Sequence, residues 1–215
     1  MKANISGTNK ILFISIFFTM LLLAIRIIHT HEYVYAFYPW NLFLALIPLA
    51  SSKRLRNQTR FGWKALFYLA IWLLFFPNAP YLLTDLFHFT ERDGCPPWFD
   101  LILVSSASWN GIVIATISLL QVENFLGKCL HYKMVRMMIF CFIVLCAYGV
   151  YLGRFLRFNS WDVIANPGDL AYYIKNSLIH PRQNFSTWAF TLIFSLLFGI
   201  IFFTIKGLNQ EKQRN

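Results

Sequence analysis

The chain has 215 residues and a formal net charge of +10, and 58% of its residues are hydrophobic while only 13% are charged. Soluble domains carry about 25% charged residues and about 45–50% apolar ones. This composition excludes an ordinary water-soluble domain, which could not bury so much apolar surface. The positive charge alone would suit nucleic-acid binding, but Lys and Arg lie between apolar segments rather than in one basic patch. We therefore predict a membrane protein that does not bind nucleic acid.

Six apolar segments predict an all-α fold, a six-helix transmembrane bundle that forms a single integral membrane domain over residues 1–215. A helix needs about 20 residues to cross the hydrocarbon core. The predicted transmembrane helices are 11–28, 33–52, 64–89, 98–122, 135–153 and 186–205. The first apolar run is the shortest, and we expect Arg26 to extend it by reaching to the membrane surface. This run resembles a signal peptide, but no small-x-small cleavage site follows it, so we expect an uncleaved first helix.

The distribution of basic residues predicts the orientation of the chain. Most Lys and Arg residues fall before the first helix, in the segments 53–64 and 128–136, and after the last helix. Because cytoplasmic loops carry an excess of Lys and Arg, these parts and both termini are predicted to be cytoplasmic. Cys95 lies in a predicted outer loop, and we expect it to react with a membrane-impermeant thiol reagent in intact cells.

The third predicted helix is the unusual one. Its apolar stretch, 64–76, is too short to cross a core of about 30 Å at about 1.5 Å per residue, and Pro77 and Pro80 follow it. We predict a break at 77–80, with Ala79 outside helical angles because it precedes a proline, and then a short outer helix. A proline kink closed by neighbouring side chains is the alternative.

Three further features concern helix packing. Pro39 and Pro48 are expected to bend the second helix. In the fourth helix, Asn110 lies near the middle of the membrane, where we expect an interhelical hydrogen bond rather than a ligand contact. Small residues at four-residue spacing beside it predict a close helix approach: Ala107, Gly111 and Ala115.

The connection between the last two predicted transmembrane helices is the longest. Residues 166–169 are typical of a turn that leads into a helix. The residues that follow place four apolar side chains on one helical face, namely Leu170, Tyr173, Ile174 and Leu178. We predict an amphipathic helix on the outer face of the membrane.

Polar residues that end the third and fifth helices predict a pocket at the outer face. Tyr81, Asp85 and His88 share a helical face at spacings of four and three. The candidate residues are Asn78, Tyr81, Asp85, His88, Asp100, Arg154, Arg157, Asn159 and Asp162. Guanidinium groups bind carboxylates and phosphates through paired hydrogen bonds. If the arginines pair with Asp85 and Asp100 they are structural clamps, and if they are free they suit an anionic headgroup or substrate.

Three functional hypotheses follow from this pocket. The first is binding of a small polar or anionic group, for example a lipid headgroup. The second is an enzyme that acts on a lipid-linked substrate, with Asp85 or His88 as the acid or base. The third is a structural or assembly subunit. No metal-ligand, P-loop, dinucleotide or serine-hydrolase motif is present, so no metal or cofactor is predicted; the lipid bilayer is the expected partner, and no oligomeric state is indicated.

Several stretches resemble a bacterial membrane-protein family known as domain of unknown function 1361. They are Pro77-Asn78-Ala79-Pro80-Tyr81, Thr84-Asp85-Leu86 with His88, Trp98-Phe99-Asp100-Leu101, and Gly153-Arg154-Phe155-Leu156-Arg157 with Asn159-Ser160-Trp161-Asp162. The resemblance covers nearly the whole chain. It implies a bacterial cytoplasmic (inner) membrane and places most of the candidate pocket at motif positions of the family, but it supplies no activity.

Overall fold

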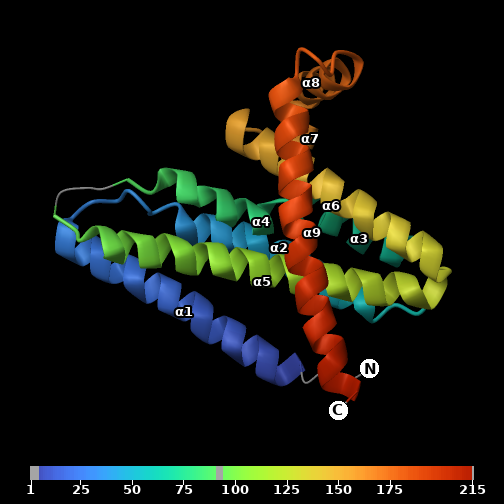
Figure 1. Ribbon diagram of the computed structural model, residues 1–215, viewed down its shortest axis with the longest axis horizontal. Helices are drawn as coiled ribbons and strands as arrows, with labels where there is room; N and C mark the ends of the chain where they lie inside the picture. Colours follow the sequence, from blue (N-terminus) through green and yellow to red (C-terminus); the bar gives the residue numbers. More distant parts are fainter. Residues whose placement is uncertain (1–4, 91–93, 215) are drawn as a thin grey trace.

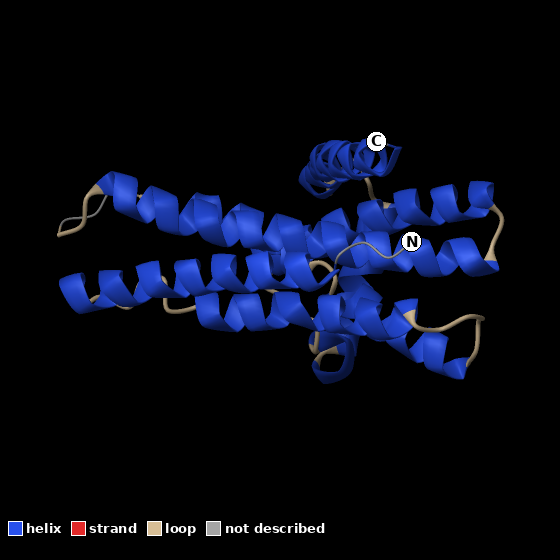
Figure 2. Ribbon diagram, turned by 90° about the horizontal axis from the view of Figure 1, so that it is seen from below, coloured by secondary structure: helices blue, strands red, loops and turns tan. Residues whose placement is uncertain are grey.

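The computed structural model describes residues 5–90 and 94–214, with the side chains of all of these except 5–9, 88 and 212–214. All regular structure in this part of the chain is helical, as Figures 1 and 2 show, so the predicted all-α fold is confirmed. The elements are α1 (Ile5–Thr30), α2 (Tyr38–Arg56), α3 (Trp63–Phe75), α4 (Asn78–Tyr81), the 3₁₀ helix η1 (Leu82–His88), α5 (Pro97–Cys129), α6 (Tyr132–Phe155), α7 (Asp162–Ala165), α8 (Pro167–Ile179) and α9 (Phe185–Arg214).

Five helical segments of the described chain are long and apolar enough to cross a membrane. They are α1, the continuous run α3–α4–η1, α5, α6 and α9. The remaining predicted segment, 33–52, corresponds to α2. This helix is not among the five, and its last turns contain two serines and three basic residues. Side chains such as Phe13 and Ile28, each more than 70% exposed, cover the outside of α1. Exposed apolar surface of this extent is stable only in contact with lipid.

The helices α1 and α2, the run α3–α4–η1, and the helices α5 and α6 follow the long axis of the molecule, and each runs opposite to the one before it (Figure 1). We call the end where α1 finishes and α5 begins the Thr30 end, and the end where α2 finishes the Arg56 end. The helix α5 is central and contacts α1, α2, α4, η1 and α6. The helix α9 crosses the others steeply and packs mainly on α6 (Figures 1 and 2).

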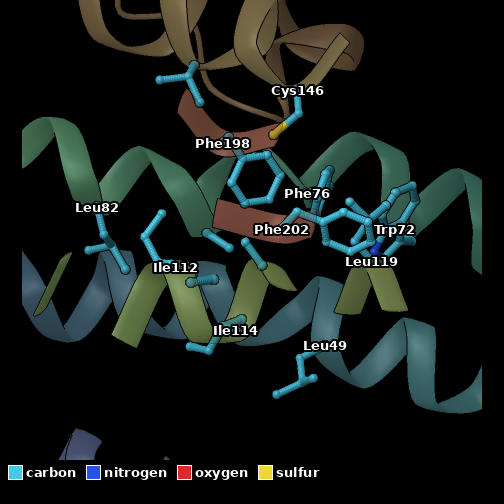
Figure 3. Packing of buried hydrophobic residues seen from close by; sticks show 14 of the residues in the cluster. Leu49, Trp72, Phe76, Leu82, Ile112, Ile114, Leu119, Cys146, Phe198 and Phe202 are labelled. Carbon is cyan, nitrogen blue, oxygen red and sulfur yellow. The ribbon is translucent and has the colours of Figure 1, made fainter. Parts of the chain in front are cut away.

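Aromatic side chains fill the centre of the bundle. Figure 3 shows Trp72 of α3, and Phe76 directly after this helix, close to Phe198 and Phe202 from α9. The Trp72 and Phe76 rings stack with centroids 4.4 Å apart, and the Phe76 and Phe198 centroids are 6.1 Å apart. Such aromatic contacts add about 0.5–1.5 kcal/mol each beyond simple burial, and they fix the short helix α3 against α9.

The helix boundaries depart from the sequence prediction at several ends. The second helix starts at Tyr38 rather than 33, so Pro39 lies in its first turn and does not bend it. Proline is favourable there because the first helical N–H groups need no partner within the helix. Pro48 does lie inside α2. Helices α5 and α9 continue past the predicted ends at 122 and 205, to Cys129 and Arg214.

The predicted break at 77–80 is wrong in extent and in kind. The α-helical pattern is interrupted only at residues 76 and 77, and both keep right-handed helical angles. Ala79 lies within α4, where the Tyr81 N–H donates to the Pro77 carbonyl at 3.0 Å. The prolines therefore loosen the helix without unwinding it. Beyond them the chain tightens into a 3₁₀ helix instead of the expected outer α-helix.

Side chains bond the carbonyl groups at this interruption. The Ser160 hydroxyl donates to the Leu74 carbonyl at 3.1 Å, and the Asn78 amide donates to the Phe75 carbonyl at 2.9 Å. The same Asn78 amide donates to Ser160 at 2.9 Å. A kink closed by neighbouring side chains, the alternative reading of the sequence, is therefore the correct one.

Two glycines of neighbouring helices allow the kinked segment to pack closely against them. A Cβ added at Gly111 of α5 would lie 2.3 Å from the Ala79 carbonyl oxygen and 2.7 Å from the Leu82 Cβ. A Cβ added at Gly149 of α6 would lie 2.6 Å from the Pro77 ring. The predicted close approach along the small-residue stripe of the fourth helix is confirmed at Gly111.

The predicted amphipathic helix is α8, which packs beside the start of α9. Leu170, Tyr173 and Ile174 are half-buried as expected, but Leu178 is 60% exposed, and Ser177 takes the buried position beside it. Hydrogen bonds hold this face in place. The Tyr173 and Thr187 hydroxyls are 2.7 Å apart, the Tyr148 and Ser177 hydroxyls are 2.8 Å apart, and the Trp188 indole donates to the Ser177 carbonyl at 2.9 Å.

Candidate functional site

An ion pair joins α1 to the start of α5 at the Thr30 end. The Arg26 Nε donates to Asp100 Oδ1 at 2.7 Å and its Nη2 donates to Oδ2 at 3.2 Å. Arg26 is 1% exposed and Asp100 is 2% exposed. The guanidinium also lies 3.5 Å from the Glu32 carboxylate and 4.9 Å from the centre of the Tyr35 ring. Arg26 is thus a buried clamp, and the expectation that it reaches to the membrane surface is wrong.

Cys95 completes this cluster from the loop before α5. Its thiol is buried and donates to Asp100 Oδ1 at 3.6 Å. Burial first, and then the negative charge of Asp100, raise the pKa of the Cys95 thiol. A buried thiol with a raised pKa reacts slowly, so Cys95 is a poor target for the labelling expected from the sequence.

A second ion pair joins η1 to the end of α6. The Arg154 Nη2 bonds Asp85 Oδ1, and its Nε donates to the Thr84 hydroxyl at 2.7 Å. The guanidinium carbon lies 4.2 Å from the centre of the Tyr81 ring, a cation–π contact. Asp85 is 1% exposed, so this pair is buried as well. Tyr81 and Asp85 do share a face, as their spacing predicts, and that face is turned toward Arg154.

Arg157 differs from the other two arginines in backbone and in surroundings. It follows the end of α6 with φ of +60°, a left-handed conformation in which glycine is usual. The Phe158 N–H donates back to the Leu152 carbonyl at 3.1 Å and closes the helix end. The Arg157 side chain is exposed, and within the described residues it has no hydrogen bond or ion pair.

Arg154 and Arg157 line one pocket of about 800 Å³, which we call the arginine pocket. Its lining residues are Tyr81, Phe87, Gly153, Arg154, Phe155, Arg157 and Asn159. Among the described residues this set contains two arginines and no acid, and the carboxylate that pairs with Arg154 is buried behind it. The volume lies in the range of about 300–1,000 Å³ that is typical of small-ligand sites.

A second hollow, the apolar groove, adjoins the arginine pocket. It has a volume of about 570 Å³ and shares Tyr81, Gly153 and Asn159 with the pocket. Its other lining residues, most of them apolar, are Trp40, Asn41, Leu44, Ala70, Leu73, Leu74, Pro77, Asn78, Leu145, Tyr148, Gly149, Leu152, Phe158, Ser160, Val163, Leu170 and Ile174. They come from α2, α3, α4, α6, α7, α8 and the loop between α6 and α7.

Asp162 shapes the loop that carries the pocket. Its carboxylate accepts the Asn159 N–H at 2.6 Å and the Asn166 amide at 3.1 Å. Asp162 is buried and does not line either hollow. It therefore positions Asn159 rather than meeting a ligand.

Asn110 makes the interhelical bond that the sequence predicts. Its amide donates to the Thr19 hydroxyl at 2.8 Å, and the Thr19 and Ser106 hydroxyls are 2.9 Å apart. These contacts join α1 to α5 inside the bundle. Asn110 is a packing residue and lines neither hollow.

The structure thus divides the candidate residues into groups. Tyr81, Arg154, Arg157 and Asn159 line the arginine pocket, Asn78 lines the apolar groove, and Asp85 and Asp162 support the pocket from behind. Asp100 pairs with Arg26 and lines neither hollow, so it is not one of the residues that form the arginine pocket. The side chain of His88 lies outside the described residues.

Sequence reasoning missed Arg26 as a partner of Asp100. The available signal was a charge within an apolar helix, which requires a partner when it is buried. The side chains described here contain no group of three or more His, Cys, Asp or Glu residues that could hold a metal ion.

Comparison with known proteins identifies the family. The family described as "Protein of unknown function (DUF1361)" matches residues 40–203. Neither a curated protein nor a solved structure matches the chain. The matched region contains the kinked third helix, the arginine pocket and the apolar groove, and it covers most of the sequence. The chain belongs to the DUF1361 family.

Proposed function

We propose that this protein crosses the cytoplasmic membrane of a bacterium six times and binds a small anionic group, such as the phosphate of a lipid headgroup, in the arginine pocket at the outer face. The single observation that carries the binding proposal is the exposed guanidinium of Arg157 in a pocket whose described lining residues include no acid. The topology proposal counts α2 as a crossing helix, because it runs beside α3 and α5 through the bundle.

The orientation follows from charge and from the arrangement of the helices. The Arg56 end carries the basic loop between α2 and α3, and cytoplasmic loops are rich in Lys and Arg. Both flanks of the apolar segments are also basic, with Lys2 and Lys10 before the first and Lys206, Lys212 and Arg214 at or after the last, which favours an even number of crossings. The Thr30 end and the arginine pocket then belong to the outer side.

The charge balance of the pocket favours an anion. Asp85 neutralises Arg154 from behind, and the positive charge of Arg157 has no counterpart among the described lining residues. Guanidinium groups bind phosphate and carboxylate through short, charge-assisted hydrogen bonds. Arg154 is held by Thr84, Asp85 and the Tyr81 ring, so its guanidinium is fixed in position before a ligand arrives.

The backbone at Arg157 supports a role for its side chain. A non-glycine residue in the left-handed region costs about 1–2 kcal/mol, and glycine would close the same helix end without that cost. No hydrogen bond or ion pair of the Arg157 side chain offsets this cost, because the guanidinium has no such partner within the described residues. Retained strain of this kind is characteristic of functional positions.

The same geometry weighs against the enzyme hypothesis that uses Asp85 as a base. A general base must reach the substrate proton directly or through one water molecule. Asp85 is buried and bonded to Arg154, so its carboxylate serves the ion pair. The purely structural hypothesis explains Arg154 but leaves the exposed Arg157 unexplained.

The test is binding of glycerol 3-phosphate to the purified full chain in detergent. We expect Arg157→Asn to weaken binding by about tenfold or more, because a hydrogen bond to a charged group contributes about 1.5–3 kcal/mol. Asparagine keeps the left-handed backbone accessible, so the fold is preserved. The matched control is Arg182→Asn, which removes an exposed arginine that does not line the pocket.

Two results would overturn the proposal. One is binding that Arg157→Asn and Arg182→Asn reduce equally, which would indicate a general effect of net charge. The other is no measurable binding by the wild-type protein at low ionic strength, where screening is weakest.

A further inference from the structure

The apolar groove begins where the arginine pocket ends. The two hollows share Tyr81, Gly153 and Asn159, so a molecule bound at Arg157 can continue into the groove without leaving the protein. Gly153 matters at this junction because the Tyr81 ring lies 3.4 Å from where its Cβ would be. A larger side chain would crowd the passage between the two hollows.

The two hollows have opposite chemistry. The arginine pocket offers charge, whereas leucines from α2, α3 and α6 line the groove together with Val163, Leu170 and Ile174 of α7 and α8. Trp40 and Leu145, at its margin, are 54% and 50% exposed, so the groove opens on the surface that lipid covers. A charged site continuous with a lipid-facing apolar groove is complementary to an amphipathic molecule.

The short helices α7 and α8 give the groove a defined wall. Asp162 fixes the start of α7, and the hydrogen bond between Tyr148 and Ser177 ties α8 to α6. Because α8 is also tied to α9 through Tyr173 and Trp188, this wall is part of the folded bundle. The groove is therefore preformed, as small-ligand sites usually are.

We propose that the ligand is a phosphate-bearing lipid, with its phosphate at Arg157 and one hydrocarbon chain in the apolar groove. This inference rests on the proposed function, since the phosphate is the anion assigned there to the arginine pocket. The chain leaves the phosphate past Tyr81 and Asn159 and runs between α3 and α6 toward the centre of the bundle.

Two probes separate the headgroup from the chain. Glycerol 3-phosphate carries the phosphate alone, and oleoyl lysophosphatidic acid carries the same phosphate with one acyl chain. Two substitutions fill the groove from different elements, namely Ala70→Trp in α3 and Val163→Trp in α7. Both residues are exposed, so the larger ring enters the groove without displacing the core. Ala24→Trp, at an exposed alanine of α1 outside both hollows, is the matched control.

We expect each groove variant to weaken lysophosphatidic acid binding by at least fivefold and to change glycerol 3-phosphate binding by less than twofold. Ala24→Trp should change neither affinity by more than twofold, which controls for partition of the lipid into detergent. Arg157→Asn should weaken both ligands.

The outcomes distinguish the two proposals. If the groove variants bind both ligands like the wild type while Arg157→Asn weakens both, the chain does not occupy the groove; this inference fails and the proposed function stands. If Arg157→Asn leaves both affinities unchanged, the proposed function fails and this inference fails with it.

Discussion

Arg26 of α1 donates two hydrogen bonds to Asp100 of α5, and both residues are almost completely buried. The pair spans 74 positions of sequence and joins the first helix to the central one. Charges withdrawn from water in this way are stable only together, because removing one partner leaves the other buried and uncompensated.

The first prediction concerns this pair. Arg26→Met should lower the free energy of unfolding in detergent by about 3–5 kcal/mol. Adding Asp100→Leu to the same chain should restore much of the loss, because no buried charge then remains. The control is Lys206→Met, which breaks a partly exposed pair with Glu123 and should cost about 1 kcal/mol or less. Equal losses in Arg26→Met and Lys206→Met would contradict the account of Arg26 as a buried clamp.

The second prediction concerns the close approach between α5 and the kinked segment. Gly111→Ala would place a Cβ 2.3 Å from a backbone oxygen, which only a shift of a whole helix relieves. We expect a loss of about 3 kcal/mol, at the upper end of the typical range of overpacking costs. Gly127→Ala in the same helix meets nothing within 4 Å. It should be neutral or stabilise by about 0.5–1 kcal/mol, and similar behaviour of the two variants in thermal unfolding would refute this packing.

The third prediction concerns pH and Cys95. Its pKa is raised by burial and by Asp100, so the thiolate is scarce at pH 7–8 and its fraction rises only at higher pH. Alkylation by iodoacetamide should therefore keep accelerating above pH 9. A thiol introduced by Gln183→Cys in a Cys95→Ser background is exposed and should follow a pKa near about 8.5. Equal labelling rates of the two thiols at pH 7.5 would show that Cys95 is not buried.

Much of the fold could be predicted because long apolar segments identify helices directly. Local sequence patterns predicted the effect of the prolines on their helices less well. Pro39 starts a helix and Pro77 only loosens one, and the sequence near Pro77 does not reveal that Gly149 makes room for its ring. The outcome at each proline depends on residues of another helix, so periodicity alone could not decide it.

The candidate site was predicted in part for a related reason. Tyr81 and Asp85 meet Arg154 as their spacing suggests, because all three lie at helix ends that face each other. The partner of Asp100 could not be chosen from the sequence, since Arg26 and Arg154 are both compatible with a pairing. The left-handed backbone of Arg157 carried no sequence signal, because glycine is the residue expected at such a position.

The central claim is that the strained Arg157 serves a ligand rather than the fold. The most direct measurement is the free energy of unfolding of Arg157→Gly, with and without glycerol 3-phosphate. Without ligand the variant should be as stable as the wild type or up to about 1 kcal/mol more stable, since the backbone strain is relieved. Ligand at ten times its wild-type dissociation constant should stabilise the wild type by about 1.4 kcal/mol and the variant hardly at all. A variant that is less stable without ligand, and that the ligand stabilises as much as the wild type, would contradict the account.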